Sequence, residues 1–200
     1  MVNAPLHHHW SHGFDDPAIG SQKTWRSIID AMANPGRLVT IHENPYAPAV
    51  FNPASAATCL TLLADETPVW TDLSWQNPAI SWLQFCCDSS VVSEPCMANF
   101  AIVTRPASMP PLDYFRVARF EYLEIATTVV IQVDDILPRA DNKYSDISFD
   151  NFTQLELKGV PDNFWQQWQK LCQKYPLGID IFFTCEDVLM SLPKNKPTEN

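Results

Sequence analysis

The chain has 200 residues, a formal net charge of −10 and 46% hydrophobic residues. A chain of this length predicts one domain that buries about 70% of the surface its unfolded form exposes, with no need of a metal or a disulfide. The acidic excess argues against unaided binding to nucleic acid and against anionic membranes, because no basic stripe is present to neutralise phosphates.

The sequence predicts a cytoplasmic protein with free thiols. It has no run of about 18 apolar residues that would span a membrane, and its first residues lack the basic-then-apolar order of a signal peptide. The six cysteines show no C-x-x-C spacing, which favours a reduced protein over a disulfide scaffold. We expect a loose arm over residues 1–13, a single domain over 14–193 and a polar tail over 194–200.

Hydrophobic spacing and turn residues predict the elements in chain order. In the first helix Trp25, Ile28, Ile29 and Met32 recur at helical spacing, and a later helix begins with Asn as its N-cap and Pro at its first position. The predicted elements are helix 21–36, strand 37–41, helix 53–65, strand 67–73, helix 77–87, strand 98–104, short helix 110–120, strand 125–133, strand 152–159, helix 162–174 capped by Asp162, and strands 179–183 and 188–192.

Helices alternate with strands through most of the chain, and several of the strands are apolar on both faces. Such strands are typical of a sheet that is covered on both sides. The sequence therefore predicts a three-layer α/β/α fold with a mixed sheet, in which the terminal hairpin forms an antiparallel edge.

The residues offer no convincing catalytic or metal site. His7, His8, His9 and His12 have the donor type for Zn²⁺ or Ni²⁺, but no regular element holds them, so we predict no native metal. A cysteine nucleophile would need a base in reach, and His42 is linked to no particular cysteine. Glycine-rich phosphate loops are absent, and the carboxylate pairs fall at loops or strand ends, as expected of solvated turns.

Three stretches form an ordered set along the chain. Segment 13–37 has a Gly-Phe start, a Trp-Arg pair and a Pro-Gly end, segment 62–70 reads LLADETPVW, and segment 175–193 reads YPLGIDIFFTCEDVLMSLP. In this order they resemble the PhnH family, a subunit of the carbon–phosphorus lyase system. The resemblance spans nearly the whole chain. It departs at residues 157–160, where the family often has Gly-Pro-Gly, and at the tail, where Lys194 stands for Arg.

The resemblance implies a fold similar to the large domain of transferases that use pyridoxal phosphate, without the residues that bind this cofactor. It also implies a homodimer, a place beside the G, I and J subunits of the lyase core complex, and a structural role. In that system a phosphonate replaces adenine at the ribose C1 of ATP, and the C–P bond is cleaved afterwards on another subunit.

Four residues are candidates for ligand or partner contacts, namely Arg26, Arg37, Gly178 and Asp180. Asp180 lies inside an apolar run, so its carboxylate needs a partner, for which Arg26, Arg37 or a backbone N–H are the options. Structural pairing is the favoured interpretation, ahead of a ligand contact and of catalysis.

Two further functions stay open from the sequence. The chain could be a relic of a transferase that keeps pyridoxal phosphate, although none of its lysines has a suggestive context; those considered are Lys23, Lys143, Lys158, Lys170 and Lys174. It could also be a small-molecule binder that takes a phosphonate or nucleotide through the four candidate residues.

Overall fold

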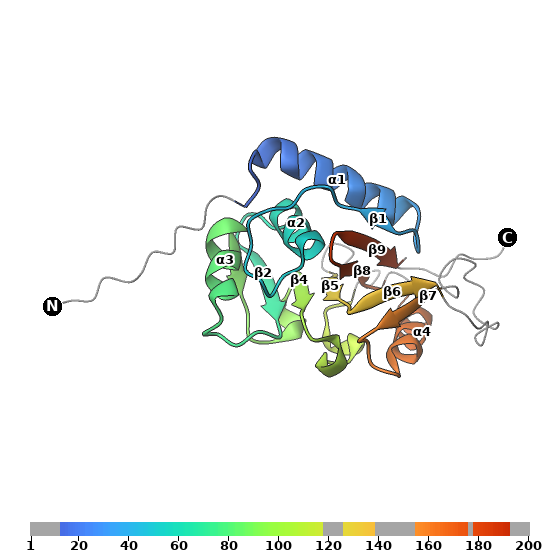
Figure 1. Cartoon of the computed structure of the whole chain (residues 1–200). Coiled ribbons are helices and arrows are strands. Elements are labelled where there is room, and N and C mark those ends of the chain that lie inside the picture. The colour runs from blue at the N-terminus through green and yellow to red at the C-terminus, as the bar shows by residue number, and fades with distance from the viewer. Residues whose placement is uncertain (1–12, 118–125, 139–154, 176–177, 193–200) are drawn as a thin grey trace.

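The computed structural model describes residues 13–117, 126–138, 155–175 and 178–192 (Figure 1). The expected arm lies outside this part of the chain except for Gly13, and the polar tail, the four N-terminal histidines and Lys143 lie wholly outside it. In the described ranges seven strands form one mixed sheet, and β6 and β7 form a separate two-stranded ribbon. The strands are β1 (Val39–Thr40), β2 (Thr67–Thr71), β3 (Ser89–Val91), β4 (Phe100–Val103), β5 (Thr128–Gln132), β6 (Asp135–Pro138), β7 (Leu155–Lys158), β8 (Asp180–Cys185) and β9 (Val188–Leu192).

Short polar caps followed by proline start the first three helices. Asp16 accepts a bond from the N–H of Ile19 at 3.0 Å, so α1 begins four residues earlier than predicted. Asn52 and Asn77 cap α2 and α3 in the same way. The predicted cap of α4 is wrong, since Asn163 occupies that position without a side-chain bond. The helices are α1 (Pro17–Ala33), α2 (Pro53–Leu62), α3 (Pro78–Cys86) and α4 (Phe164–Lys174), with 3₁₀ turns η1 (Pro95–Met97), η2 (Pro106–Ser108) and η3 (Leu112–Tyr114).

The sheet runs in the order β1-β9-β8-β5-β4-β2-β3. Strands β3, β2, β4, β5 and β8 are parallel, and β9 and β1 are each antiparallel to the neighbour they join, so the predicted mixed α/β sheet is confirmed. The hairpin β8–β9 does not form the edge as predicted, because β1 pairs with the outer side of β9. Strands β3 and β6 were not predicted. Of the predicted helix 110–120, the described residues 110–117 hold the turn η3 instead of a helix, and residues 118–120 lie outside the described ranges.

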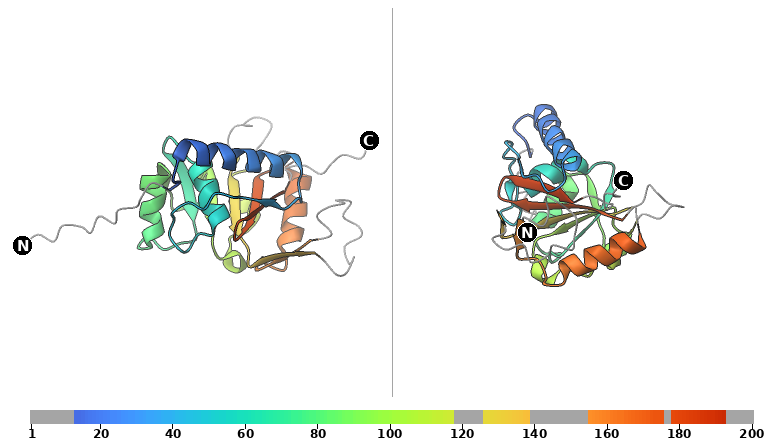
Figure 2. Two further views of the ribbon diagram at one scale, coloured as in Figure 1. Left: turned by 45° about the horizontal axis from the view of Figure 1, so that its top comes forward. Right: turned by 90° about the vertical axis from the view of Figure 1, so that its right-hand side faces the viewer.

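Two apolar cores lie on the two faces of the sheet. Helices α1, α2 and α3 contribute to one core and α4 to the other, and the end-on view shows α1 and α4 on opposite sides (Figure 2). Successive residues of β4 alternate between them, with Phe100 and Ile102 in the first core and Ala101 and Val103 in the second. The central strands are therefore apolar on both faces.

Close packing fixes the start of α1. Gly20 lies on the inner face of this helix, and a Cβ placed there would lie 2.5 Å from Cγ of Phe14, which is itself buried. The ring of Phe14 thus occupies the space that any larger residue at position 20 would need.

Replacing Gly20 with alanine is expected to lower the free energy of unfolding. Alanine gains about 1 kcal/mol of helix propensity over glycine, but the clash with Phe14 costs about 1–3 kcal/mol of overpacking. Urea denaturation measures the difference, with Gln22→Ala on the exposed side of the same helix as a control that should change stability by less than about 0.5 kcal/mol. A Gly20→Ala protein more stable than the parent would show that the ring does not constrain this helix.

Candidate functional site

The carboxyl ends of the parallel strands meet at one edge of the sheet, which we call the carboxyl edge. Asp72 follows β2, Thr104 follows β4, Gln132 ends β5, and Thr184 lies near the end of β8. In open α/β sheets this edge is where ligands bind, because the strand ends and the loops after them leave room for polar side chains. The carboxyl edge is therefore the first place in this fold to look for chemistry.

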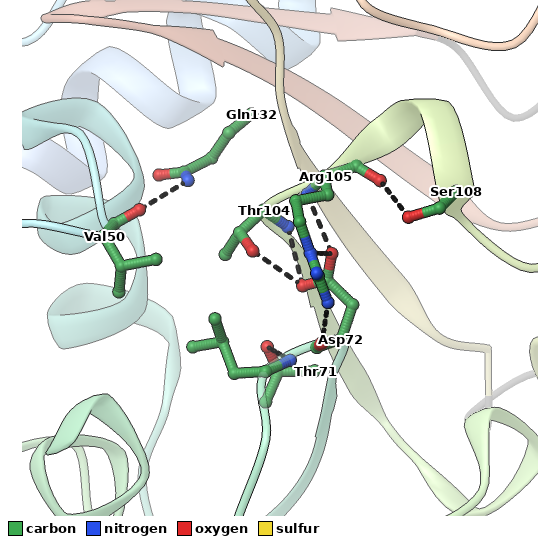
Figure 3. A network of polar contacts seen from close by, with 8 residues as sticks. Val50, Thr71, Asp72, Thr104, Arg105, Ser108 and Gln132 are labelled. Carbon is green, nitrogen blue, oxygen red and sulfur yellow. Dashed lines mark hydrogen bonds and ion pairs between the residues drawn. The ribbon is translucent and has the colours of Figure 1, made fainter. Parts of the chain in front are cut away.

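A carboxylate bridges the ends of β2 and β4 (Figure 3). Oδ1 of Asp72 accepts bonds from the backbone N–H of Thr104 at 2.9 Å and from its hydroxyl at 2.8 Å, and Oδ2 accepts from the N–H of Arg105 at 2.8 Å. The guanidinium of Arg105 donates to the backbone oxygen of Asp72 at 2.8 Å, and its Nε lies 3.7 Å from Oδ2. The Asp72 side chain is only 8% exposed, so its charge is satisfied by these neighbours instead of by water.

A second polar network closes the other half of the carboxyl edge. Gln132 donates from Nε2 to the backbone oxygen of Val50 at 2.8 Å (Figure 3). Its Oε1 accepts the backbone N–H of Asn52 at 2.7 Å. Asn52 also reaches Thr184, whose hydroxyl lies 2.7 Å from the hydroxyl of Ser55. These bonds tie the start of α2 to the ends of β5 and β8.

The first amides of α2 point toward this edge but are already used. The N–H of Ser55 donates to the Asn52 side chain at 2.8 Å, and the N–H of Ala54 donates to the backbone oxygen of Glu186 at 2.9 Å. A helix start with free amides would attract an anion. Here the cap and the β8–β9 turn take that place.

The four residues proposed from the sequence lie elsewhere. Asp180 is the first residue of β8 and pairs in register with Thr128, the first residue of β5, so it lies at the amino end of the strands. Gly178 has φ +42°, a conformation that favours glycine, and its N–H donates to the oxygen of Tyr175. Arg37 forms its ion pair with Asp30 at 3.3 Å, and Arg26 is exposed on α1. None of the four belongs to the networks of the carboxyl edge.

Thiol and amine chemistry finds little support in the described residues. Burial raises the pKa of Cys59, and burial followed by the neighbouring thiol of Cys59 raises the pKa of Cys87, which disfavours the nucleophilic thiolate. All six cysteines are free, and His42 is exposed. The lysines in this part of the chain lie at the surface, namely Lys23, Lys158, Lys170 and Lys174.

A search of the described ranges finds no group of three or more His, Cys, Asp or Glu side chains placed to hold a metal ion. Over the same ranges, none of the helices combines the length and the apolar character that crossing a membrane requires.

Sequence reasoning missed the residues of the carboxyl edge, although a signal was present. Asp72 lies at the end of predicted strand 67–73, and Thr104 ends predicted strand 98–104. Because parallel strands end at the same edge, polar residues at those two positions are expected to share that edge, whereas their direct contact depends on strand order. Attention to an acid within a strand selected Asp180, whereas attention to polar residues at strand ends would have selected Asp72.

Comparison with known proteins finds similarity along nearly the whole chain. A family model described as "Bacterial phosphonate metabolism protein (PhnH)" matches residues 12–198. The chain is also 28% identical over 191 residues to the "Alpha-D-ribose 1-methylphosphonate 5-triphosphate synthase subunit PhnH" of Rhizobium meliloti, an alignment that covers 95% of this chain and 96% of that protein. The match runs through every element from α1 to β9.

Replacing Asp72 with asparagine is expected to lower the free energy of unfolding by about 1–3 kcal/mol, because the amide NH₂ would face a backbone N–H and leave a buried donor without an acceptor. Asp30→Asn is the matched reference. Its ion pair with Arg37 is well exposed, so its loss should cost less than about 1 kcal/mol. Urea denaturation of both variants checks the order, and equal losses would contradict the importance of the Asp72 network.

Proposed function

Because the chain belongs to the PhnH family of bacterial phosphonate metabolism proteins, we propose that it is a subunit of a carbon–phosphorus lyase complex and supplies surfaces instead of catalytic groups. The family match extends over residues 12–198 and is therefore not confined to one short motif. The Rhizobium meliloti relative is itself named as a subunit of a synthase, which supports a role within an assembly. The proposed partners are a second copy of the chain and the G, I and J subunits.

The proposed reaction of the complex is the transfer of an alkylphosphonate to the ribose C1 of ATP, where it replaces adenine before the C–P bond is cleaved. The name of the relative, a ribose 1-methylphosphonate 5-triphosphate synthase subunit, describes the product of such a transfer. In this proposal the chain contributes no catalytic residue, metal or cofactor to either step.

The observation that carries the non-catalytic role is that the backbone donors described at the carboxyl edge already bond to groups of this chain. A reaction between ATP and a phosphonate gathers several negative charges, so its site needs donors that are free to stabilise them. Here the amides of Thr104 and Arg105 bind Asp72, and the first amides of α2 bind groups of this chain. The guanidinium of Arg116, another described cation, donates to the oxygen of Cys96 and to Asn99.

The outer face of α1 supports a role in assembly. Trp25, Ile29 and Met32 recur at spacings of four and three along this helix and are 49%, 46% and 44% exposed. An apolar stripe at this spacing lies on one side of the helix, which suits packing against another protein. We call these three residues the α1 stripe and propose that it forms part of the dimer contact.

The finer features of the fold belong to the same proposal. Helices on both sides of the sheet support a three-layer arrangement similar to the large domain of transferases that use pyridoxal phosphate, with the cofactor absent. Residues 14–193 form a single domain in this proposal. Its six free cysteines support a place in the cytoplasm, where ATP is available.

The proposed function predicts that the tagged chain co-purifies with the G, I and J subunits when all are co-expressed. The assembled complex is expected to consume ATP and methylphosphonate, and the chain alone is expected to consume neither. Phosphorus NMR follows both reactions. Turnover by the purified chain alone would contradict the non-catalytic role, and failure to co-purify with any of the three would contradict the assembly role.

Replacing Trp25 with glutamate is expected to weaken the dimer roughly 30-fold or more, because a buried tryptophan at the centre of an interface typically contributes at least about 2 kcal/mol. Light scattering after gel filtration measures the mass over a range of concentrations. Phe85→Glu, on the exposed side of α3, is the matched control and should leave the mass unchanged. If the two variants weaken the dimer equally, or if neither weakens it, the α1 stripe is not the contact.

A further inference from the structure

The junction between β2 and β4 is the point where the strand order reverses. After β2 the chain enters α3, whose Trp82 and Leu83 belong to the core beneath α1. After β4 it enters the segment of η2 and η3, whose Leu112 and Phe115 belong to the core beneath α4. From here β2 leads to β3 on one side, and β4 leads to β5 on the other. Such a reversal leaves a crevice at the carboxyl ends of the two strands, where ligands of open α/β sheets bind.

The donors at this junction form a set suited to an oxyanion. Two consecutive backbone N–H groups, of Thr104 and Arg105, converge on one carboxylate together with the Thr104 hydroxyl. The guanidinium of Arg105 lies beside the carboxylate, and the Arg105 side chain is 70% exposed. Paired amides, a hydroxyl and a guanidinium are the groups with which proteins stabilise carboxylate and phosphate oxygens.

The Asp72 carboxylate occupies the position of a ligand in this set. An aspartate that only shapes a turn bonds to backbone groups one to three residues further along the chain. Asp72 instead bonds to residues that are 32 and 33 positions away, just past the end of the neighbouring strand β4. Its two oxygens take separate donors, as the oxygens of a bound anion would.

We propose that the ends of β2 and β4 form an oxyanion-binding site and that Asp72 is its resident anion. The class of ligand is a small oxyanion, either a carboxylate or a phosphate or phosphonate group. The unaltered chain binds no such ligand there, because a carboxylate attached to the same polypeptide has a very high effective concentration at the site. This inference concerns the isolated chain and does not rest on the proposed function.

The test is chemical rescue of Asp72→Ala. This variant removes the carboxylate and leaves its donors facing a vacant space, so its melting temperature should fall by several degrees. Formate, phosphate and methylphosphonate are titrated separately, with potassium chloride of equal ionic strength as reference. We expect at least one of them to raise the melting temperature of Asp72→Ala in a saturable way, since a ligand that binds only the folded state stabilises it. The order of the three distinguishes a carboxylate site from a phosphoryl site.

Three controls make the result specific. The unaltered chain should not respond beyond the chloride reference, and Asp72→Asn should not respond because its side chain still fills the space. Adding Arg105→Gln to Asp72→Ala should raise the ligand concentration that gives half of the stabilisation roughly tenfold. The reason is the loss of a charged hydrogen-bond donor, whose side chain is largely exposed. Equal stabilisation of the unaltered chain and the alanine variant, or no stabilisation of the variant, would overturn the proposal.

A folding defect does not prevent the test. If Asp72→Ala is insoluble, it is refolded with and without methylphosphonate and formate, and recovery only in their presence supports the site. If neither condition yields folded protein, Asp72→Ser, which keeps a hydroxyl acceptor, is titrated in the same way. Absence of any response in that variant overturns the proposal. The readout is stability of the isolated chain, so it is independent of assembly with other subunits.

Discussion

Burial of the central strands on both faces is the constraint on which the rest of this structure depends. Every residue of β4 is buried, as are Val129–Ile131 of β5 and Ile181–Phe183 of β8. A polar side chain within such a strand would lose its water and find no donor, at a cost of several kcal/mol. The strand ends, where loops and helix starts provide partners, are therefore where polar groups gather.

The polar groups at the carboxyl edge bond to one another and to the start of α2. In enzymes of this general architecture the same edge holds polar groups that bind the substrate. In this chain the bonds run between strands, with Asp72 joining β2 to β4 and Gln132 and Thr184 joining β5 and β8 to the start of α2. Such bonds make the edge part of the stabilising framework. Under the proposed assembly role, partners contact the outer surfaces, including the α1 stripe.

Helix α1 illustrates how a pattern can be right about an element and incomplete about its environment. The spacing of Trp25, Ile28, Ile29 and Met32 correctly predicted a helix, but only Ile28 of these is buried, together with the small residues Gly20, Thr24 and Ala31. Small residues let the helix lie close to the core, as the contact of Gly20 with Phe14 shows. The larger apolar residues are left on the outer side, which periodicity alone cannot distinguish from the inner one.

The sequence by itself determined the type and rough position of most elements, the starts of α2 and α3 and the two-faced apolar character of the strands. These depend on residues close together in the chain, such as Asn52 with Ser55 or Asn77 with Ala79. Only the tertiary structure decided that β1 lies outside β9, that Asp180 sits at the amino end of the sheet, and that Asp72 meets Thr104 and Arg105. Those outcomes follow from strand order, which is set by how whole faces pack against one another, and no local pattern of residues encodes a contact between segments thirty or more positions apart.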